Sequence, residues 1–146
     1  MSTSNKQEKK SYRILIVDDD PDILESFREG LLDSNIINSV FGQETSLKID
    51  TYASPKSALS DFKAGIYDLL LLDIKMPEIN GFELYEELKK VDSKPKVCFI
   101  TAFETYYEEL KKDFPKLDVG CFIKKPIPIS DLAKRIKTEL KHWNHR

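Results

Sequence analysis

Hydrophobic residues recur along the chain in five short continuous runs, separated by longer stretches of mixed character. The runs cover residues 12–17, 47–52, 67–72, 96–100 and 119–123. Continuous apolar runs of this length, without polar alternation, are typical of strands that are covered on both faces. The pattern therefore predicts five strands, and such strands occur mostly in parallel sheets.

The stretches between the runs carry apolar residues at helical spacing. They predict helices over 21–32, from Ser54 and Pro55 to a stop at Gly65, over 82–91 and 104–112, and from Ser130 onward. Asp20 is the expected N-cap of the first helix. Strands that alternate with helices indicate an α/β fold, with a parallel sheet and helices on both of its faces.

One connection is unusually long for a link between a helix and a strand. It covers residues 33–46 and contains several apolar side chains. Two alternatives fit it, an extended helix or a local packing flap. In either case we expect this segment to lie at the N-terminal ends of the strands.

Composition and charge narrow the class of protein. The 146 residues fit one domain, 40% are hydrophobic, and the net charge of −2 does not favour nucleic acid as a partner. No apolar run approaches the roughly 18 residues of a membrane span. We expect a disordered tail over 1–11, one domain over 12–142 and a short tail over 143–146.

The positions of the cysteines and histidines limit which catalytic and metal sites the domain can contain. Cys98 and Cys121 lie in apolar runs, which predicts buried free thiols in a reducing, cytoplasmic compartment. The only histidines, His142 and His145, fall in the last five residues. A Ser-His-Asp triad or an HExxH zinc site therefore cannot be built inside the domain.

Acidic side chains follow two of the predicted strands. Asp18 and Asp19 come directly after the first strand, and Asp73 ends the run LLLLD of the third. Since the C-terminal ends of parallel strands meet at one edge, we expect these carboxylates to converge there. Converging carboxylates repel unless a cation joins them, and an oxygen-only set suits Mg²⁺.

Two further strand ends complete the predicted site. Thr101 ends the fourth strand, and Lys124 and Lys125 follow the fifth. Phosphoryl transfer needs a nucleophile, a metal and a cation, which Asp73, Mg²⁺ and one lysine would supply, with Thr101 as a hydroxyl donor. Strand alternation does not decide between the two lysines.

The pieces ILIVDDDPDI, LLLLDIKMPEINGFEL, FITAF and FIKKP together resemble a response-regulator receiver domain of two-component signalling, over about residues 12–142. The resemblance implies a flavodoxin-like sheet of order 2-1-3-4-5 with five helices. It implies a signalling switch that is not an enzyme beyond its own phosphorylation and dephosphorylation. A sensor histidine kinase or a His-phosphotransfer protein would supply the phosphoryl group.

The resemblance also assigns roles to residues. It implies Asp73 as phospho-acceptor, Asp18, Asp19, Asp73 and the Lys75 backbone carbonyl as Mg²⁺ ligands, and Lys125 rather than Lys124 as the phosphoryl contact. Thr101 and Phe122 would form the switch, although Phe122 lacks the hydroxyl of a tyrosine. Lys75 and Phe103 would tune dephosphorylation, and the apolar Phe103 predicts slow loss of the phosphoryl group.

An alternative of another class is a haloacid-dehalogenase-like Mg²⁺-dependent phosphohydrolase. Asp18 and Asp20 match its first motif superficially, but Asp22 departs from that motif and a late acidic pair is missing.

For the receiver hypothesis, output would pass through a protein contact, onward transfer to a histidine, or a homodimer formed by the fourth helix, fifth strand and fifth helix. Whether the chain is part of a longer protein is left open.

Overall fold

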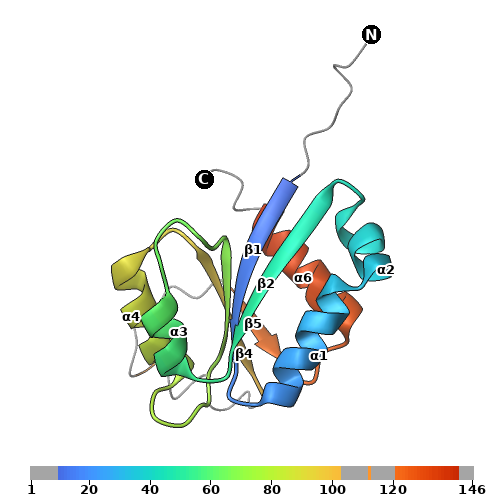
Figure 1. Ribbon diagram of the computed structural model, residues 1–146. Helices are drawn as coiled ribbons and strands as arrows, with labels where there is room; N and C mark the ends of the chain where they lie inside the picture. Colours follow the sequence, from blue (N-terminus) through green and yellow to red (C-terminus); the bar gives the residue numbers. More distant parts are fainter. Residues whose placement is uncertain (1–9, 103–111, 113–120, 142–146) are drawn as a thin grey trace.

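The computed structural model describes residues 10–102, 112 and 121–141. Its centre is a five-stranded parallel sheet of order β2-β1-β3-β4-β5 (Figure 1). The strands are β1 (Lys10–Val17), β2 (Thr45–Tyr52), β3 (Leu69–Asp73), β4 (Lys96–Thr101) and β5 (Phe122–Lys124). The predicted doubly wound α/β fold and strand order are confirmed, and the strand order reverses at β1 and β3.

Helices cover both faces of this sheet. Helices α1 (Pro21–Leu32) and α6 (Ile129–Lys141) lie on one face, and α3 (Pro55–Asp61) and α4 (Gly81–Val91) lie on the other (Figure 1). The predicted helix over 104–112 lies outside the described residues, except for Lys112. No helix of the described part is long and apolar enough to span a membrane.

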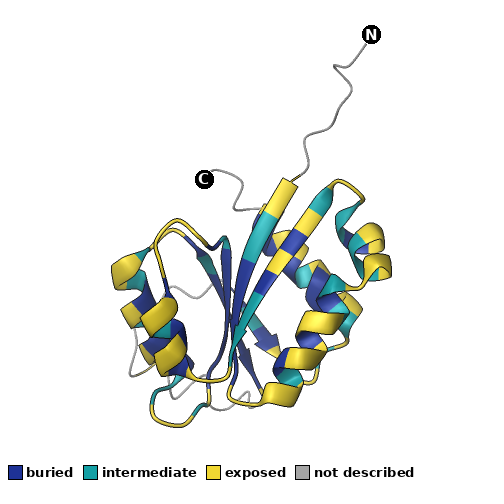
Figure 2. Ribbon diagram, viewed as in Figure 1, coloured by how far each residue is buried: buried dark blue, intermediate teal, exposed yellow. Residues whose placement is uncertain are grey.

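The core consists of two layers, one on each side of the sheet. Leu69 and Leu71 of β3 pack in the layer under α1 and α6, whereas Leu70 and Leu72 pack in the layer under α3 and α4. Alternate side chains of a strand point to opposite faces. All four leucines are fully buried, which explains the uninterrupted apolar run in the sequence (Figure 2).

Local capping explains where the helices begin and end. Asp20 caps α1 as predicted, because its side chain accepts a hydrogen bond from the Asp22 N–H at 3.0 Å. The predicted stop at Gly65 is wrong, since α3 already ends at Asp61. Gly65 instead lies in the following turn with φ of +82°, a conformation that glycine adopts without strain.

The long connection after α1 forms an extra helical segment. Residues Ser34–Ile36 make the short helix α2, which continues as the π-helical turn η2 (Ile37–Phe41). Val40 of η2 is buried in the same core layer as Leu140 of α6. The segment is therefore helical, but Asp33 separates it from α1, and it packs on the core as the flap alternative expected. It reaches the start of β1, where the Lys10 N–H donates to the Glu44 carbonyl at 2.8 Å.

The two cysteines correct one prediction. Cys98 and Cys121 are buried as expected, but they form a disulfide instead of remaining free thiols. The reason is the strand register, which pairs Phe99 with Phe122 and so places the two preceding residues side by side, with Cα atoms 4.6 Å apart. The predicted strand order already makes β4 and β5 neighbours, but it does not give the register that brings these two cysteines together.

Candidate functional site

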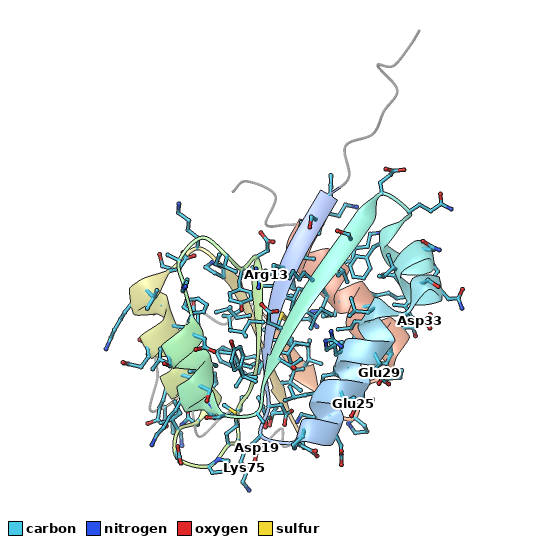
Figure 3. All side chains as sticks on the ribbon, viewed as in Figure 1. Arg13, Asp19, Glu25, Glu29, Asp33 and Lys75 are labelled. Atoms are coloured by element: carbon cyan, nitrogen blue, oxygen red, sulfur yellow. A yellow bond between two sulfur atoms is a disulfide. The ribbon has the colours of Figure 1, made fainter. Side chains whose placement is uncertain are left out.

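Three carboxylates gather at the C-terminal edge of the sheet. Asp18 and Asp19 follow β1, Asp73 ends β3, and one oxygen of each lies within 4.8 Å of the others. Asp18 and Asp73 are buried, whereas Asp19 is exposed. Figure 3 shows Asp19 and Lys75, which belongs to the β3–α4 loop, at this same end of the sheet. The predicted convergence of these acids is thus present in the structure.

Lys125 provides the positive charge in this cluster. Its Nζ lies 2.8 Å from an Asp18 oxygen and 3.3 Å from an Asp73 oxygen. Its backbone N–H donates to the Thr101 carbonyl at 2.8 Å, which ties the residue to the end of β4. Lys124 is exposed, so the geometry distinguishes the two lysines that strand alternation left open.

The cluster shifts the pKa values of its members. Burial and the neighbouring Asp18 raise the pKa of Asp73 to about 7, although Lys125 works in the opposite direction. Burial lowers the pKa of Lys125, but its hydrogen bond to Asp18 and the charges of Asp73 and Asp18 outweigh burial and raise it. A single lysine therefore does not offset the burial and crowding of these acids.

The backbone around Asp73 is held by the loop that follows it. The Ile74 N–H donates to the Ile100 carbonyl of β4 at 3.0 Å, and the Gly81 N–H donates to the Ile74 carbonyl at 2.9 Å. Gly81 begins α4, and a Cβ at this position would overlap the Asp73 carbonyl oxygen. This explains the glycine of the MPEING stretch, which the sequence analysis left without a structural role.

Thr101 and Phe122 flank the cluster on the neighbouring strands. Thr101 is buried at the end of β4. The Phe122 ring is half-buried and lies 5.7 Å from Phe99 and 6.0 Å from Phe82, measured between ring centroids. Its surroundings are aromatic, as a packing-based role would need. Phe103 lies outside the described residues, so its predicted role stays a prediction.

The hydrolase alternative needs Asp20 in the reacting cluster. Asp20 instead caps α1, and its N–H donates to Asp18 at 2.9 Å. The interaction holds the turn after β1 and helps to orient the buried Asp18 carboxylate. The first motif of that alternative is therefore explained by helix capping.

Comparisons with known proteins agree with this geometry. The family model of the response regulator receiver domain matches residues 14–137. Among curated proteins, the chain is 30% identical over 129 residues to the transcriptional regulatory protein CiaR of Streptococcus pneumoniae, covering 88% of this chain and 51% of CiaR. It is 30% identical over 138 residues to the response regulator SaeR of Staphylococcus aureus, covering 91% and 54%. The chain spans about half the length of these curated relatives.

Solved structures show the same likeness. A CheY-like receiver domain protein from Methanospirillum hungatei has a TM-score of 0.70 at 25% identity, covering 92% of this chain and 98% of that one. The response regulator TrrA of Thermotoga maritima, crystallised with Mg²⁺ and a beryllium fluoride, has a TM-score of 0.67 at 30% identity, covering 88% and 98%.

Fold, acidic cluster and family match lead to one assignment. Receiver domains are signalling modules rather than enzymes, they are phosphorylated on an aspartate, and they interact with histidine kinases. The chain belongs to the response regulator receiver domain family of two-component signalling.

Proposed function

We propose that Asp73 accepts a phosphoryl group from a phosphohistidine of a sensor kinase or a His-phosphotransfer protein, in a Mg²⁺-dependent reaction. The observation that carries this proposal is the convergence of Asp18, Asp19 and Asp73 with the Lys125 ammonium. An Asp73 oxygen attacks phosphorus, an O–P bond forms, and the P–N bond to the donor imidazole breaks. The imidazole leaves and takes a proton from solvent.

The residues present fit a magnesium ion. The donors are carboxylate oxygens at a strand edge, with Asp19 open to water. Burial and the neighbouring Asp18 raise the pKa of Asp73, so an added positive charge would favour its ionised form. Asp18, Asp19, Asp73 and the Lys75 carbonyl would hold the ion. It would supply positive charge that offsets the charges of the acids and of the phosphoryl oxygens.

Lys125 and Thr101 act on the phosphoryl group itself. Lys125 is already within 3.3 Å of Asp73, so its ammonium can pair with a phosphoryl oxygen once the group is attached. Thr101, at the end of β4, supplies a hydroxyl donor to the same group. We propose that this contact and the repacking of Phe122 against Phe82 and Phe99 carry the signal to the surface.

An apolar groove beside the cluster supports a protein as the donor. It has a volume of about 510 Å³ and is lined by Ile23 and Phe27 of α1, by Pro126 and Ile127, and by Lys125 at its edge. An apolar surface adjoining the acceptor can hold a helix that presents a histidine.

The predicted cytoplasmic location and the domain limits 12–142 stay proposals, and the disulfide removes the free-thiol argument for that location.

The test is phosphorylation with a small acyl phosphate or phosphoramidate, with and without Mg²⁺, mapped by peptide mass spectrometry. The label should fall on Asp73, require Mg²⁺ and disappear in Asp73→Asn. Asp61→Asn, an exposed acid on α3, is the matched control and should label normally. Stoichiometric label on Asp73→Asn would overturn the assignment.

A second arm tests the metal site. Asp19→Asn should weaken Mg²⁺ binding and labelling together, while the folded state stays intact, because Asp19 is exposed and its loss relieves like-charge repulsion. A variant that unfolds without metal, or binds Mg²⁺ as wild type does, would contradict the role of Asp19.

A further inference from the structure

A groove lies at the other end of the sheet, between η2 and α6. It consists of two adjoining cavities of about 260 and 370 Å³, both lined by Lys137 and Lys141. Tyr12, Phe41 and Leu140 give the first cavity an apolar floor, and Val40 contributes to the second. We call this the basic groove, since its rim carries Lys10, Lys134, Lys137 and Lys141.

Few negative charges line this rim among the residues that the structure describes. Glu44 is the one acidic residue among the described residues that line it. Within the described part of the chain, the four rim lysines form no ion pair, whereas Lys56, Lys89 and Lys90 elsewhere on the surface do. Lys134, Lys137 and Lys141 follow each other at three- and four-residue spacing on α6, which places like charges side by side.

The given sequence on either side of the main described region is more basic than acidic. Lys10 and Lys141, at the two ends of the main described region, both line the groove. The flanking sequence 1–9 holds Lys6 and Lys9 with a single acid, Glu8, and 142–146 holds Arg146 and no acid. A partner that carries carboxylates would find lysine ammonium groups on this rim that form no ion pair within the described part of the chain.

The shape and surroundings of the groove select the kind of partner. The first cavity, of about 260 Å³, has about half the volume of the groove beside Asp73, so it takes fewer side chains than the face of a helix would insert. An extended polyanion such as a nucleic acid would also run toward α1, which carries the exposed Glu25 and Glu29 and is followed by Asp33 (Figure 3). A short extended peptide avoids both conflicts.

We propose that the basic groove binds a short acidic segment of a partner protein in extended form. One apolar side chain of that segment enters the floor between Tyr12, Phe41 and Leu140. Carboxylates on either side of it pair with Lys137 and Lys141. This surface is independent of the proposed phosphorylation, because it lies at the opposite end of β1, where Lys10 is roughly 26 Å from Asp18 at about 3.3 Å per residue.

The segment 33–46 gives the groove its distinctive wall. Val40 and Phe41 of η2 contribute apolar surface, and Glu44 closes one end. A chain with a short link between α1 and β2 would leave the lysines of α6 without this wall. The extra helical segment thus has a binding role besides its packing against α6.

The test measures binding of a fluorescein-labelled peptide of sequence EDELEDE by fluorescence anisotropy at physiological salt. We expect saturable binding, weaker when the central leucine is replaced by serine and absent for KRKLKRK. The variant Lys137→Glu/Lys141→Glu should bind at least about tenfold more weakly, because two charge pairs become repulsive. The matched control Lys63→Glu/Lys94→Glu makes the same charge change at exposed sites outside the groove and should bind as wild type does.

Three outcomes would overturn the proposal. One is equal binding of the peptide by both double variants, provided that circular dichroism shows both folded. A second is tighter binding of an oligothymidine strand or of anionic lipid vesicles than of the peptide, which would indicate a general polyanion surface. A third is self-association in sedimentation experiments that the groove variant abolishes, which would indicate a second copy of the chain as occupant.

Discussion

Gly81 lies directly against the backbone carbonyl of Asp73, so closely that a Cβ on Gly81 would overlap the carbonyl oxygen. The first residue of α4 therefore rests on the residue that we propose as phospho-acceptor. Because the obstructing atom belongs to the backbone, it cannot move aside as a flexible side chain could. The position of the Asp73 carboxylate is thus coupled to the start of α4.

We expect Gly81→Ala to lower the free energy of unfolding by about 1–3 kcal/mol, the usual range for an overpacked site. It should also slow phosphorylation, because Asp73 or α4 must shift. Urea denaturation and the labelling assay measure the two effects. Ser60→Ala, on exposed α3, is a control that should change neither. Wild-type behaviour of Gly81→Ala in both assays would contradict the coupling.

In metal-free protein, Asp73→Asn should be more stable than wild type at neutral pH. The pKa of Asp73 is raised to about 7 in the folded state, so the neutral form adds stability that is fully present below the unfolded pKa of about 3.8. Wild type loses this stability as pH rises through about 7, whereas asparagine stays neutral. We expect an advantage of about 2 kcal/mol at pH 8, roughly half of what the pKa difference gives without solvent screening.

Urea denaturation in a chelator, from about pH 5 to pH 8, checks this dependence. The advantage of Asp73→Asn should grow across the range and shrink when Mg²⁺ is added, since Mg²⁺ stabilises only the wild-type cluster. Glu25→Gln, an exposed carboxylate on α1, is the control and should show no such trend. An advantage that falls with rising pH would have the wrong sign for a buried, crowded carboxylate.

Reduction should destabilise the protein through the Cys98–Cys121 disulfide. The bond joins residues 23 positions apart, and closing such a loop restricts the unfolded chain by about 3 kcal/mol. Denaturation with and without dithiothreitol measures the loss. The variant Cys98→Ala/Cys121→Ala should be insensitive to the reductant. Equal stability of wild type under both conditions would show that the bond contributes nothing.

The lifetime of the phosphorylated state depends on access of water to phosphorus. Phe103, two residues beyond Thr101, has no polar atom to orient a water molecule, so we expect slow intrinsic dephosphorylation. After donor removal with Mg²⁺ saturating, Phe103→Ala should lose its label faster than wild type. Phe62→Leu, in the core under α3, is a control for a changed aromatic far from the acceptor. Equal decay of Phe103→Ala and wild type would rule out the shielding role.

Sequence reasoning was sufficient where the signal is local or periodic. Helix α1 has the predicted bounds and cap because Asp20 and Pro21 carry the start signal themselves. The acids at the ends of β1 and β3 were also predictable, since parallel strands share one edge. The contact of Lys125 with Asp18 spans 107 positions, and strand alternation alone could not choose it over Lys124.

The features that the sequence did not predict depend on how elements distant in the chain contact each other in space. The disulfide requires a particular register between β4 and β5, which the predicted strand order does not supply. The close contact of Gly81 with Asp73 depends on the path of the loop between them. The basic groove needs η2 to pack on α6, whereas the pattern of 33–46 indicated only an extra helix or a flap.

The division of the core into two layers has a consequence for how such a molecule can be used. The ring of Phe122 packs in the layer under α3 and α4, whereas the basic groove is built on the layer under α1 and α6. The sheet stands between them as a partition (Figure 2). A rearrangement of the aromatic cluster on one side of the sheet need not disturb the basic groove on the other side. One small domain can therefore carry both a switching surface and a binding surface that does not change.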